Sequence, residues 1–119
     1  MVAEIQFTVL CDNHGQGELQ TEHGFALWLH SPELNLLFDT GSGQTLLANA
    51  ELLDIRLNDC QMVVLSHGHY DHSGGLDTLW QMGVQCPVMA HPSVILPRYS
   101  RHPQKPVRSI GMPTSVVTQ

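Results

Sequence analysis

The sequence predicts an α/β fold, in which strands and helices pack in layers around one core. Three short apolar runs come first along the chain, and a helix–strand–helix–strand pattern follows them. The chain has 119 residues with 42% hydrophobic and 13% charged content, which is typical of one globular domain. No apolar run approaches the roughly 20 residues that cross a membrane. We therefore expect a single domain over residues 1–119 and no membrane partner.

Three strands are expected in the first third of the chain. β-branched and other apolar residues predict strands over residues 5–10, 25–29 and 35–38. A polar, glycine-containing loop over 11–23 separates the first two strands. Ser31-Pro32-Glu33 has the residues of a tight turn, so the second and third strands should form a hairpin.

Helices and strands then alternate. Apolar residues at helical spacing predict helices over 44–53 and 75–82, after a loop over 39–43, and apolar runs predict strands over 62–65 and 87–90. Residues 57–59 are expected to form a cap or a short turn. Five prolines follow His91, so the remainder should be mostly loop, with the final "SVVTQ" as the start of a strand.

The cysteines and the N-terminus bear on the compartment. Cys11, Cys60 and Cys86 are odd in number and have no CxxC spacing, which argues for free thiols over a disulfide framework, with a metal role as the alternative. The first residues, "MVAEIQF", lack the basic and long apolar regions of a signal peptide. We expect a cytoplasmic protein.

Charge is distributed unevenly. The net charge of −6 disfavours binding to nucleic acid. Residues 1–97 carry one arginine against all eleven acidic residues, or −10, whereas four of the five basic residues follow: Arg98, Arg101, Lys105 and Arg108. A basic segment beside an acidic body could suit an anionic small-molecule substrate, and the alternative is a solvated loop.

The stretch "SHGHYDHSGG" carries the chemistry. Three histidines and an aspartate, namely His67, His69, Asp71 and His72, directly follow an apolar run. Imidazole and carboxylate groups are ligands for zinc and similar ions. Residues two apart in an extended loop point the same way, so His67 and His69 can face one ion. The other two can face a second ion nearby.

This motif resembles the HxHxDH signature of the metallo-β-lactamase superfamily. The stretches "TEHGFALWL", "LLFDTGSGQTLLANAELL" and "VVLSHGHYDHSGGLDTL" resemble one branch in particular, the metal-dependent hydrolases like dihydropterin-type ribofuranosylaminobenzene phosphate synthase. The resemblance runs from about residue 5 to residue 112. It implies the N-terminal half of an αββα sandwich, with a mixed sheet and helices on one face.

The resemblance also implies roles for individual residues. His67 and His69 would bind the first metal ion, and Asp71 and His72 the second, with zinc, iron or manganese as the metal. Two ions would activate water and polarise a phosphoryl or carbonyl oxygen, and Asp71 could also accept a proton. Asp39 would support the ligand loop by accepting a hydrogen bond from a ligand histidine, or, alternatively, interact with a helix dipole. His23 and His91 are candidates for substrate contacts.

The superfamily completes its site from a second half that brings further ligands, and this chain ends before any of them. We expect a truncated domain whose uncovered sheet face needs a second copy or a second chain. Three functions therefore remain open: a metal-dependent hydrolase or pterin-related synthase-like enzyme, a non-catalytic metal-binding half-domain that acts as a partner subunit, and an inactive fragment.

Overall fold

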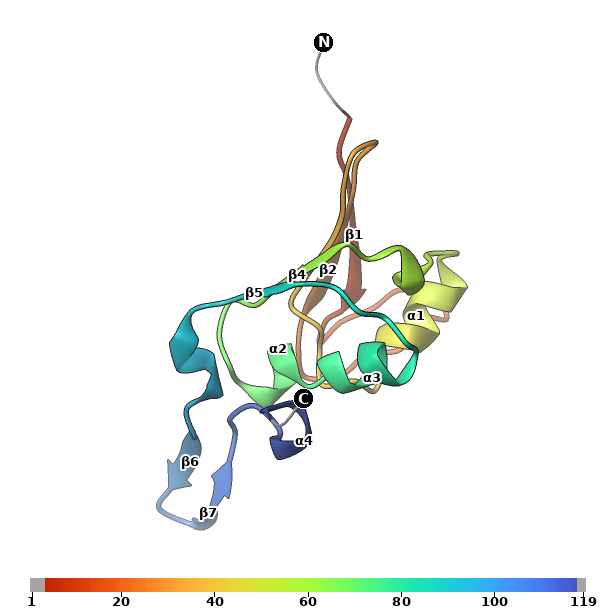
Figure 1. Cartoon of the computed structure of the whole chain (residues 1–119). Coiled ribbons are helices and arrows are strands. Elements are labelled where there is room, and N and C mark those ends of the chain that lie inside the picture. The colour runs from red at the N-terminus through yellow and green to blue at the C-terminus, as the bar shows by residue number, and fades with distance from the viewer. Residues whose placement is uncertain (1–3, 118–119) are drawn as a thin grey trace.

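A mixed five-stranded sheet with helices on one face forms the body of the protein, as a computed structural model of residues 4–117 shows (Figure 1). The strands lie in chain order: β1 (Gln6–Cys11), β2 (Ala26–His30), β3 (Asn35–Phe38), β4 (Met62–Val64) and β5 (Val88–Met89). The pairs β1–β2 and β2–β3 are antiparallel, and the pairs β3–β4 and β4–β5 are parallel. The predicted α/β class and the β2–β3 hairpin are confirmed.

The helices are short. They are α1 (Leu46–Leu52), the 3-10 turn η1 (Leu57–Asp59), α2 (Tyr70–Ser73) and α3 (Leu76–Gln81). The helices α1 and α3 lie within the predicted ranges 44–53 and 75–82. The helix α2 was not predicted, because four residues are too few to show a helical period. It places Asp71 and His72 on a helical turn instead of in an extended loop.

One face of the sheet forms the core with the helices. Trp28, Leu37 and Val63 are neighbours across β2, β3 and β4, and Leu37 and Val63 are fully buried. Side chains of α1 and α3, including Leu46 and Leu79, complete this cluster. Each such side chain contributes roughly 1.5–3 kcal/mol on burial. This packing holds the carboxyl ends of β3 and β4 in place.

The opposite face is apolar but less covered, and we call it the open face. Its residues are half-buried or exposed: Phe7, Val9, Leu27, Leu29, Leu36, Phe38, Met62, Val64 and Met89. The apolar run over 62–65 predicts a strand with two covered faces, and the helices of the described residues cover one of them. Val63 is buried, whereas Met62 and Val64 are half-buried because nothing described packs over them.

Residues after His91 are more ordered than the prolines predicted. They form a 3-10 turn η2 (Pro92–Ile95), a hairpin of β6 (Tyr99–His102) and β7 (Lys105–Ser109), and α4 (Thr114–Val117). Proline is compatible here because Pro92 opens a helical turn and Pro106 lies in a two-stranded ribbon, where a strand has a free edge. The loop prediction is therefore wrong for this segment.

The strand expected at "SVVTQ" is also wrong where the structure describes it. Residues 114–117 form α4, because the Pro113 carbonyl accepts the amides of Val116 and Val117, and Val116 packs into the core. Residues 118–119 of that stretch lie outside the described residues. Among residues 4–117, no helix has the length and apolar character to cross a bilayer.

Candidate metal centre

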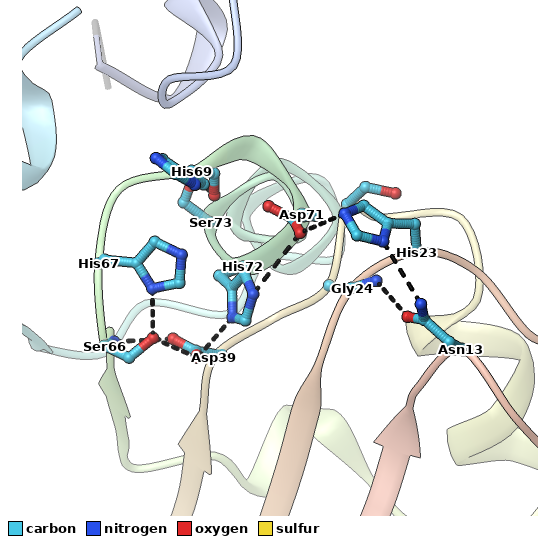
Figure 2. A network of polar contacts seen from close by, with 12 residues as sticks. Asn13, His23, Gly24, Asp39, Ser66, His67, His69, Asp71, His72 and Ser73 are labelled. Atoms are coloured by element: carbon cyan, nitrogen blue, oxygen red, sulfur yellow. Dashed lines mark hydrogen bonds and ion pairs between the residues drawn. The ribbon is translucent and has the colours of Figure 1, made fainter. Parts of the chain in front are cut away.

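The histidine and aspartate side chains gather at the carboxyl ends of β3 and β4, where the chain leads into α2 (Figure 2). One ligand atom from each of His67, His69 and Asp71 can be chosen so that all lie within 4.8 Å of one another. The ring centroids of His67 and His69 are 4.7 Å apart, and those of His67 and His72 are 4.2 Å apart. The four predicted ligands therefore form one cluster.

Asp39 is the polar centre beneath this cluster. Its side chain is 1% exposed, and its backbone adopts a left-handed φ of 57° directly after β3. One carboxylate oxygen accepts the amide of Ser66 at 2.8 Å. The other accepts the Ser66 hydroxyl at 2.6 Å and Nδ1 of His72 at 2.8 Å. Asp39 precedes α1 by seven residues, so its contacts are with the ligand loop and not with that helix.

These bonds fix the tautomers of two histidines. A carboxylate only accepts, so Nδ1 of His72 must donate to Asp39 and its Nε2 is left without a proton in the neutral ring. The Ser66 hydroxyl donates its one proton to Asp39 and can only accept from Nδ1 of His67, which lies 2.8 Å away. Both imidazoles therefore offer Nε2, the unprotonated nitrogen that a metal ion requires.

The surroundings of His67 favour its neutral ring. Burial, followed by electrostatic repulsion from His72 and His69, lowers the pKa of His67 below the usual value of 6.5, although Asp39 and Asp71 act in the opposite direction. A neutral imidazole is the form that ligates metal. The cluster thus favours the ligand state of His67 near neutral pH.

Asp71 receives its own support from the loop before β2. Nε2 of His23 lies 3.1 Å from Oδ2 of Asp71. The Asn13 side-chain oxygen accepts the Gly24 amide at 3.3 Å, which turns the Asn13 NH₂ group toward Nδ1 of His23, 3.4 Å away. Because Nδ1 accepts, the proton of His23 resides on Nε2 and is donated to Asp71 (Figure 2).

Two glycines permit the close packing of this site. A Cβ on Gly24 would lie 2.5 Å from the Asp71 carbonyl oxygen, and the Gly24 φ is 155°. A Cβ on Gly68 would lie 2.1 Å from the Val94 carbonyl oxygen. These distances are incompatible with any side chain. Gly24 thus brings the start of β2 against α2, and Gly68 brings η2 against the ligand loop.

The Glu22 carboxylate ties neighbouring loops together. It accepts the Cys11 thiol at 3.1 Å, the Thr45 hydroxyl at 3.1 Å, the Ser42 amide at 3.2 Å and the Ser42 hydroxyl. Burial alone would raise the pKa of Glu22, but these hydrogen bonds outweigh it and lower the pKa below 4.5. Burial also raises the pKa of the Cys11 thiol to about 12, which makes it a poor metal ligand.

The remaining candidate, His91, has a different environment. Its Nδ1 contacts the Ser93 hydroxyl at 2.8 Å and accepts the Ser93 amide at 3.1 Å, so it caps η2, and its side chain is exposed. Ser66 and Asn13 were missed in the sequence. Ser66 could have been noticed because it follows the strand predicted over 62–65, but no local pattern marks Asn13.

The donor set fits a divalent metal ion. The unprotonated Nε2 atoms and a nearby carboxylate are nitrogen and oxygen donors of the kind that zinc binds, and iron and manganese accept the same set. The hydrogen bonds to Asp39 supply the outer support that ligand histidines normally have.

Comparison with known proteins agrees with this geometry. A sequence profile of the metallo-beta-lactamase superfamily matches residues 20–111. The chain belongs to the metallo-β-lactamase superfamily. The resemblance inferred from its motifs is confirmed, and superfamily members bind metal ions at such sites.

Two relatives come from Methanocaldococcus jannaschii. The chain is 34% identical over 71 residues to 7,8-dihydropterin-6-methyl-4-(beta-D-ribofuranosyl)-aminobenzene-5'-phosphate synthase. This alignment covers 58% of the chain and 24% of the synthase. The chain is 32% identical over 94 residues to an uncharacterized protein, covering 77% of the chain and 36% of the relative. The chain thus spans about a quarter to a third of the length of these relatives.

Solved structures show the same fold. Tm1679, described as a metal-dependent hydrolase of the beta-lactamase superfamily, matches with a TM-score of 0.74 and 32% identity, over 96% of this chain and 39% of that one. The Rm3 metallo-beta-lactamase matches with a TM-score of 0.53 and 32% identity, over 63% of this chain and 29% of its own. The predicted fold class is confirmed.

Proposed function

We propose that the protein is a metal-dependent hydrolase-like member of its superfamily that acts on a small molecule with a phosphoryl or carbonyl group. The observation that carries the proposal is the convergence of His67, His69 and Asp71 within 4.8 Å, above a buried carboxylate that fixes the tautomers of His67 and His72. A divalent metal ion supplies Lewis acidity, which activates water and polarises the bond to be cleaved.

Each residue then has a defined role. His67, His69, Asp71 and His72 hold one or two ions, with zinc as the first candidate and iron or manganese as alternatives. Asp39 keeps Nε2 of His72 free, and through Ser66 it does the same for His67. Asp71 is also the candidate acceptor for a proton from the reacting water. His23 and His91 remain candidates for substrate contacts.

A transfer reaction related to pterins is a narrower form of this proposal. It is supported by the similarity to the dihydropterin-linked synthase from M. jannaschii, which extends over 58% of the chain. We also propose a cytoplasmic location, which agrees with the three free cysteines.

A second candidate function is a non-catalytic metal-binding half-domain that acts as a partner subunit. The open face favours it, because an apolar sheet face of this kind can bind another chain. In this case the ligand cluster would bind metal, but a further chain would be needed for turnover.

Metal content tests the shared core of both candidates. The purified chain should retain zinc or a similar ion after dialysis, and His67→Ala/His69→Ala should lose most of it, because two of the four clustered donors are removed. Elemental analysis gives the metal per chain. The matched control is His14→Ala/His30→Ala, which removes two histidines outside the cluster. Equal metal in the two double variants and the parent would contradict the proposal.

A further inference from the structure

Four of the five basic residues lie on one arm of the molecule. The β6–β7 hairpin with its flanking residues, 98–109, carries Arg98, Arg101, Lys105 and Arg108, and we call it the basic hairpin. Its segment has no acidic residue, and Asp77 is the last acidic residue of the sequence. The rest of the chain carries a single arginine, Arg56, which lies beside Asp59. The basic hairpin therefore attracts anions that the acidic body repels.

The base of the basic hairpin is fixed to the ligand loop. The Tyr70 amide donates to the Ile110 carbonyl at 3.1 Å, and the Ile110 amide donates to the Arg98 carbonyl at 2.8 Å. Tyr70 lies between His69 and Asp71 in the chain. The preceding turn, η2, packs its Val94 carbonyl against Gly68. The arm thus starts at the candidate metal centre and extends away from the body (Figure 1).

One side of the basic hairpin forms a hollow rich in hydrogen-bond donors. Its lining residues are Ser100, His102, Lys105, Pro106 and Arg108. Ser100 lies opposite Arg108 in the hairpin register, and His102 lies opposite Lys105. The lining contains no carboxylate, and it combines a guanidinium, an ammonium, an imidazole and a hydroxyl group.

The hydrogen bonds of His102 and Arg98 show which side chains are available to a ligand. Nδ1 of His102 accepts the Gln104 amide at 3.2 Å, so the proton of the neutral ring lies on Nε2, where it can be donated to a ligand. Arg98 instead uses its guanidinium on the backbone, donating to the Pro97 carbonyl at 3.1 Å and the Ser93 carbonyl at 3.5 Å. Arg98 therefore braces the base, and the donors for a ligand are His102, Lys105 and Arg108.

We infer that the basic hairpin binds the phosphate group of a small-molecule ligand. Guanidinium and ammonium groups recognise phosphate through charge-assisted hydrogen bonds, and a hydroxyl and an imidazole N–H add neutral donors. That this ligand is the substrate of the metal centre rests on the proposed function. Phosphate binding by the hairpin itself does not, because none of its donors belongs to the metal cluster.

Equilibrium dialysis of the full chain with radiolabelled inorganic phosphate, and separately with phenyl phosphate, tests the inference. Chelator and low ionic strength are used, so that no metal ion binds the anion and screening is weak. Lys105→Gln/Arg108→Gln is compared with Arg56→Gln, which removes the basic residue outside the arm. All three sites are exposed, and circular dichroism verifies that the variants fold.

We expect saturable binding of both probes by the parent chain. The affinity should be about tenfold weaker in Lys105→Gln/Arg108→Gln, because two solvent-exposed charged donors are lost. It should be unchanged in Arg56→Gln. No saturable binding by the parent chain would overturn the inference, as would equal affinity in the double variant. The inference would also be overturned if phenyl phosphate did not bind and bound inorganic phosphate were displaced only by an oligonucleotide. That result would indicate a surface for polyanions. Equal metal content in His67→Ala/His69→Ala and the parent, with phosphate binding intact, would sink the proposed function alone.

Discussion

The buried carboxylate of Asp39 fixes the tautomers of two candidate metal ligands, His67 and His72. Its three hydrogen bonds go to the Ser66 amide, the Ser66 hydroxyl and Nδ1 of His72. Without the Asp39 carboxylate, these three part-buried donors would lose their acceptor. The left-handed backbone at Asp39 is tolerated because aspartate adopts that region more readily than most residues.

Substitution of Asp39 by asparagine should weaken metal binding. Asp39→Asn replaces one carboxylate oxygen with an NH₂ group, so the variant cannot accept all three hydrogen bonds, and its remaining oxygen is an uncharged acceptor. We expect zinc affinity to fall by about 10–100-fold, as is typical when support of a ligand histidine is lost. Competition with a chromophoric chelator measures the affinity, and Asp54→Asn, an exposed aspartate that also has a positive φ, is the control. Unchanged affinity would show that Asp39 serves folding only.

His23 should matter through Asp71. The side chain is 71% exposed, so its removal leaves the core intact, yet its Nε2 proton holds one oxygen of Asp71. His23→Leu should lower zinc affinity by about tenfold, whereas His23→Gln, whose amide can reach the same position, should restore part of it. The same chelator competition measures both.

His14→Leu, in the same loop, is the control for His23. If the Leu and Gln variants lose affinity equally, the orientation of Asp71 by a hydrogen bond is excluded. If His14→Leu loses as much as His23→Leu, the effect belongs to the loop as a whole.

Residue-level prediction succeeded where chemistry is concentrated in the sequence. Three histidines and an aspartate within six positions indicate metal binding directly, and Asp39 follows a strand that ends beside them. Asn13 acts from a loop ten residues before its partner His23. Only the folded chain brings these two residues together, so no local spacing could identify Asn13.

At the scale of elements, the Glu22 carboxylate joins the loop before β2 to the residues that open α1. It accepts hydrogen bonds from Ser42 and Thr45, and from Cys11 at the end of β1. The two loops meet near Asp39 and Asp71, because the Gly41 amide donates to the Phe25 carbonyl at 2.8 Å and the Phe25 amide donates to the Asp71 carbonyl at 3.2 Å. Glu22 therefore stabilises the frame that supports the ligand cluster.

Glu22→Gln should destabilise the protein by about 1–2 kcal/mol at pH 7, since hydrogen bonds to a charged acceptor are stronger than those to an amide. The folded state lowers the pKa of Glu22 below 4.5, so its contribution is fully present above that value and is lost as the pH falls through the lowered folded-state pKa. Urea denaturation at pH 7 and pH 3 measures the free energy of unfolding.

The decisive quantity is the difference in the free energy of unfolding between the parent and Glu22→Gln. This difference should be smaller at pH 3 than at pH 7. Glu51→Gln, an exposed glutamate of α1, should have little effect at either pH. A difference that is the same at both pH values would mean that Glu22 does not act through its charge.

Elements were predicted well where side-chain periodicity is strong and poorly where it is not. The β2–β3 hairpin and the helices α1 and α3 follow from alternating or helical apolar spacing. The β6–β7 hairpin has mostly exposed residues and a proline in β7, so its strands carry no burial pattern for a reader of the sequence. Backbone pairing and its anchorage to Tyr70 determine it instead.

At the scale of the whole molecule, the described residues, 4–117, cover the sheet on one side only. The open face holds nine apolar side chains, of which Phe7, Val9 and Met89 are 63%, 45% and 59% exposed. Monomeric proteins rarely leave a contiguous apolar patch of this kind uncovered, and such patches mark interaction surfaces. Cross-strand neighbours such as Val9, Leu27 and Phe38 make the patch continuous across β1, β2 and β3.

The chain should therefore self-associate, or be poorly soluble, when it is expressed alone. Association of two open faces would remove apolar area from water, which is favourable by roughly 25 cal/mol per Å². Size exclusion with light scattering at low micromolar concentration should give a dimer or larger species. Val9→Lys should shift it toward the monomer, because a charge would then enter the interface, whereas Leu52→Lys, an equally exposed apolar position on α1, should not. A sharp monomer peak with a cooperative melt for the parent chain would show that this sheet is stable with its open face in water.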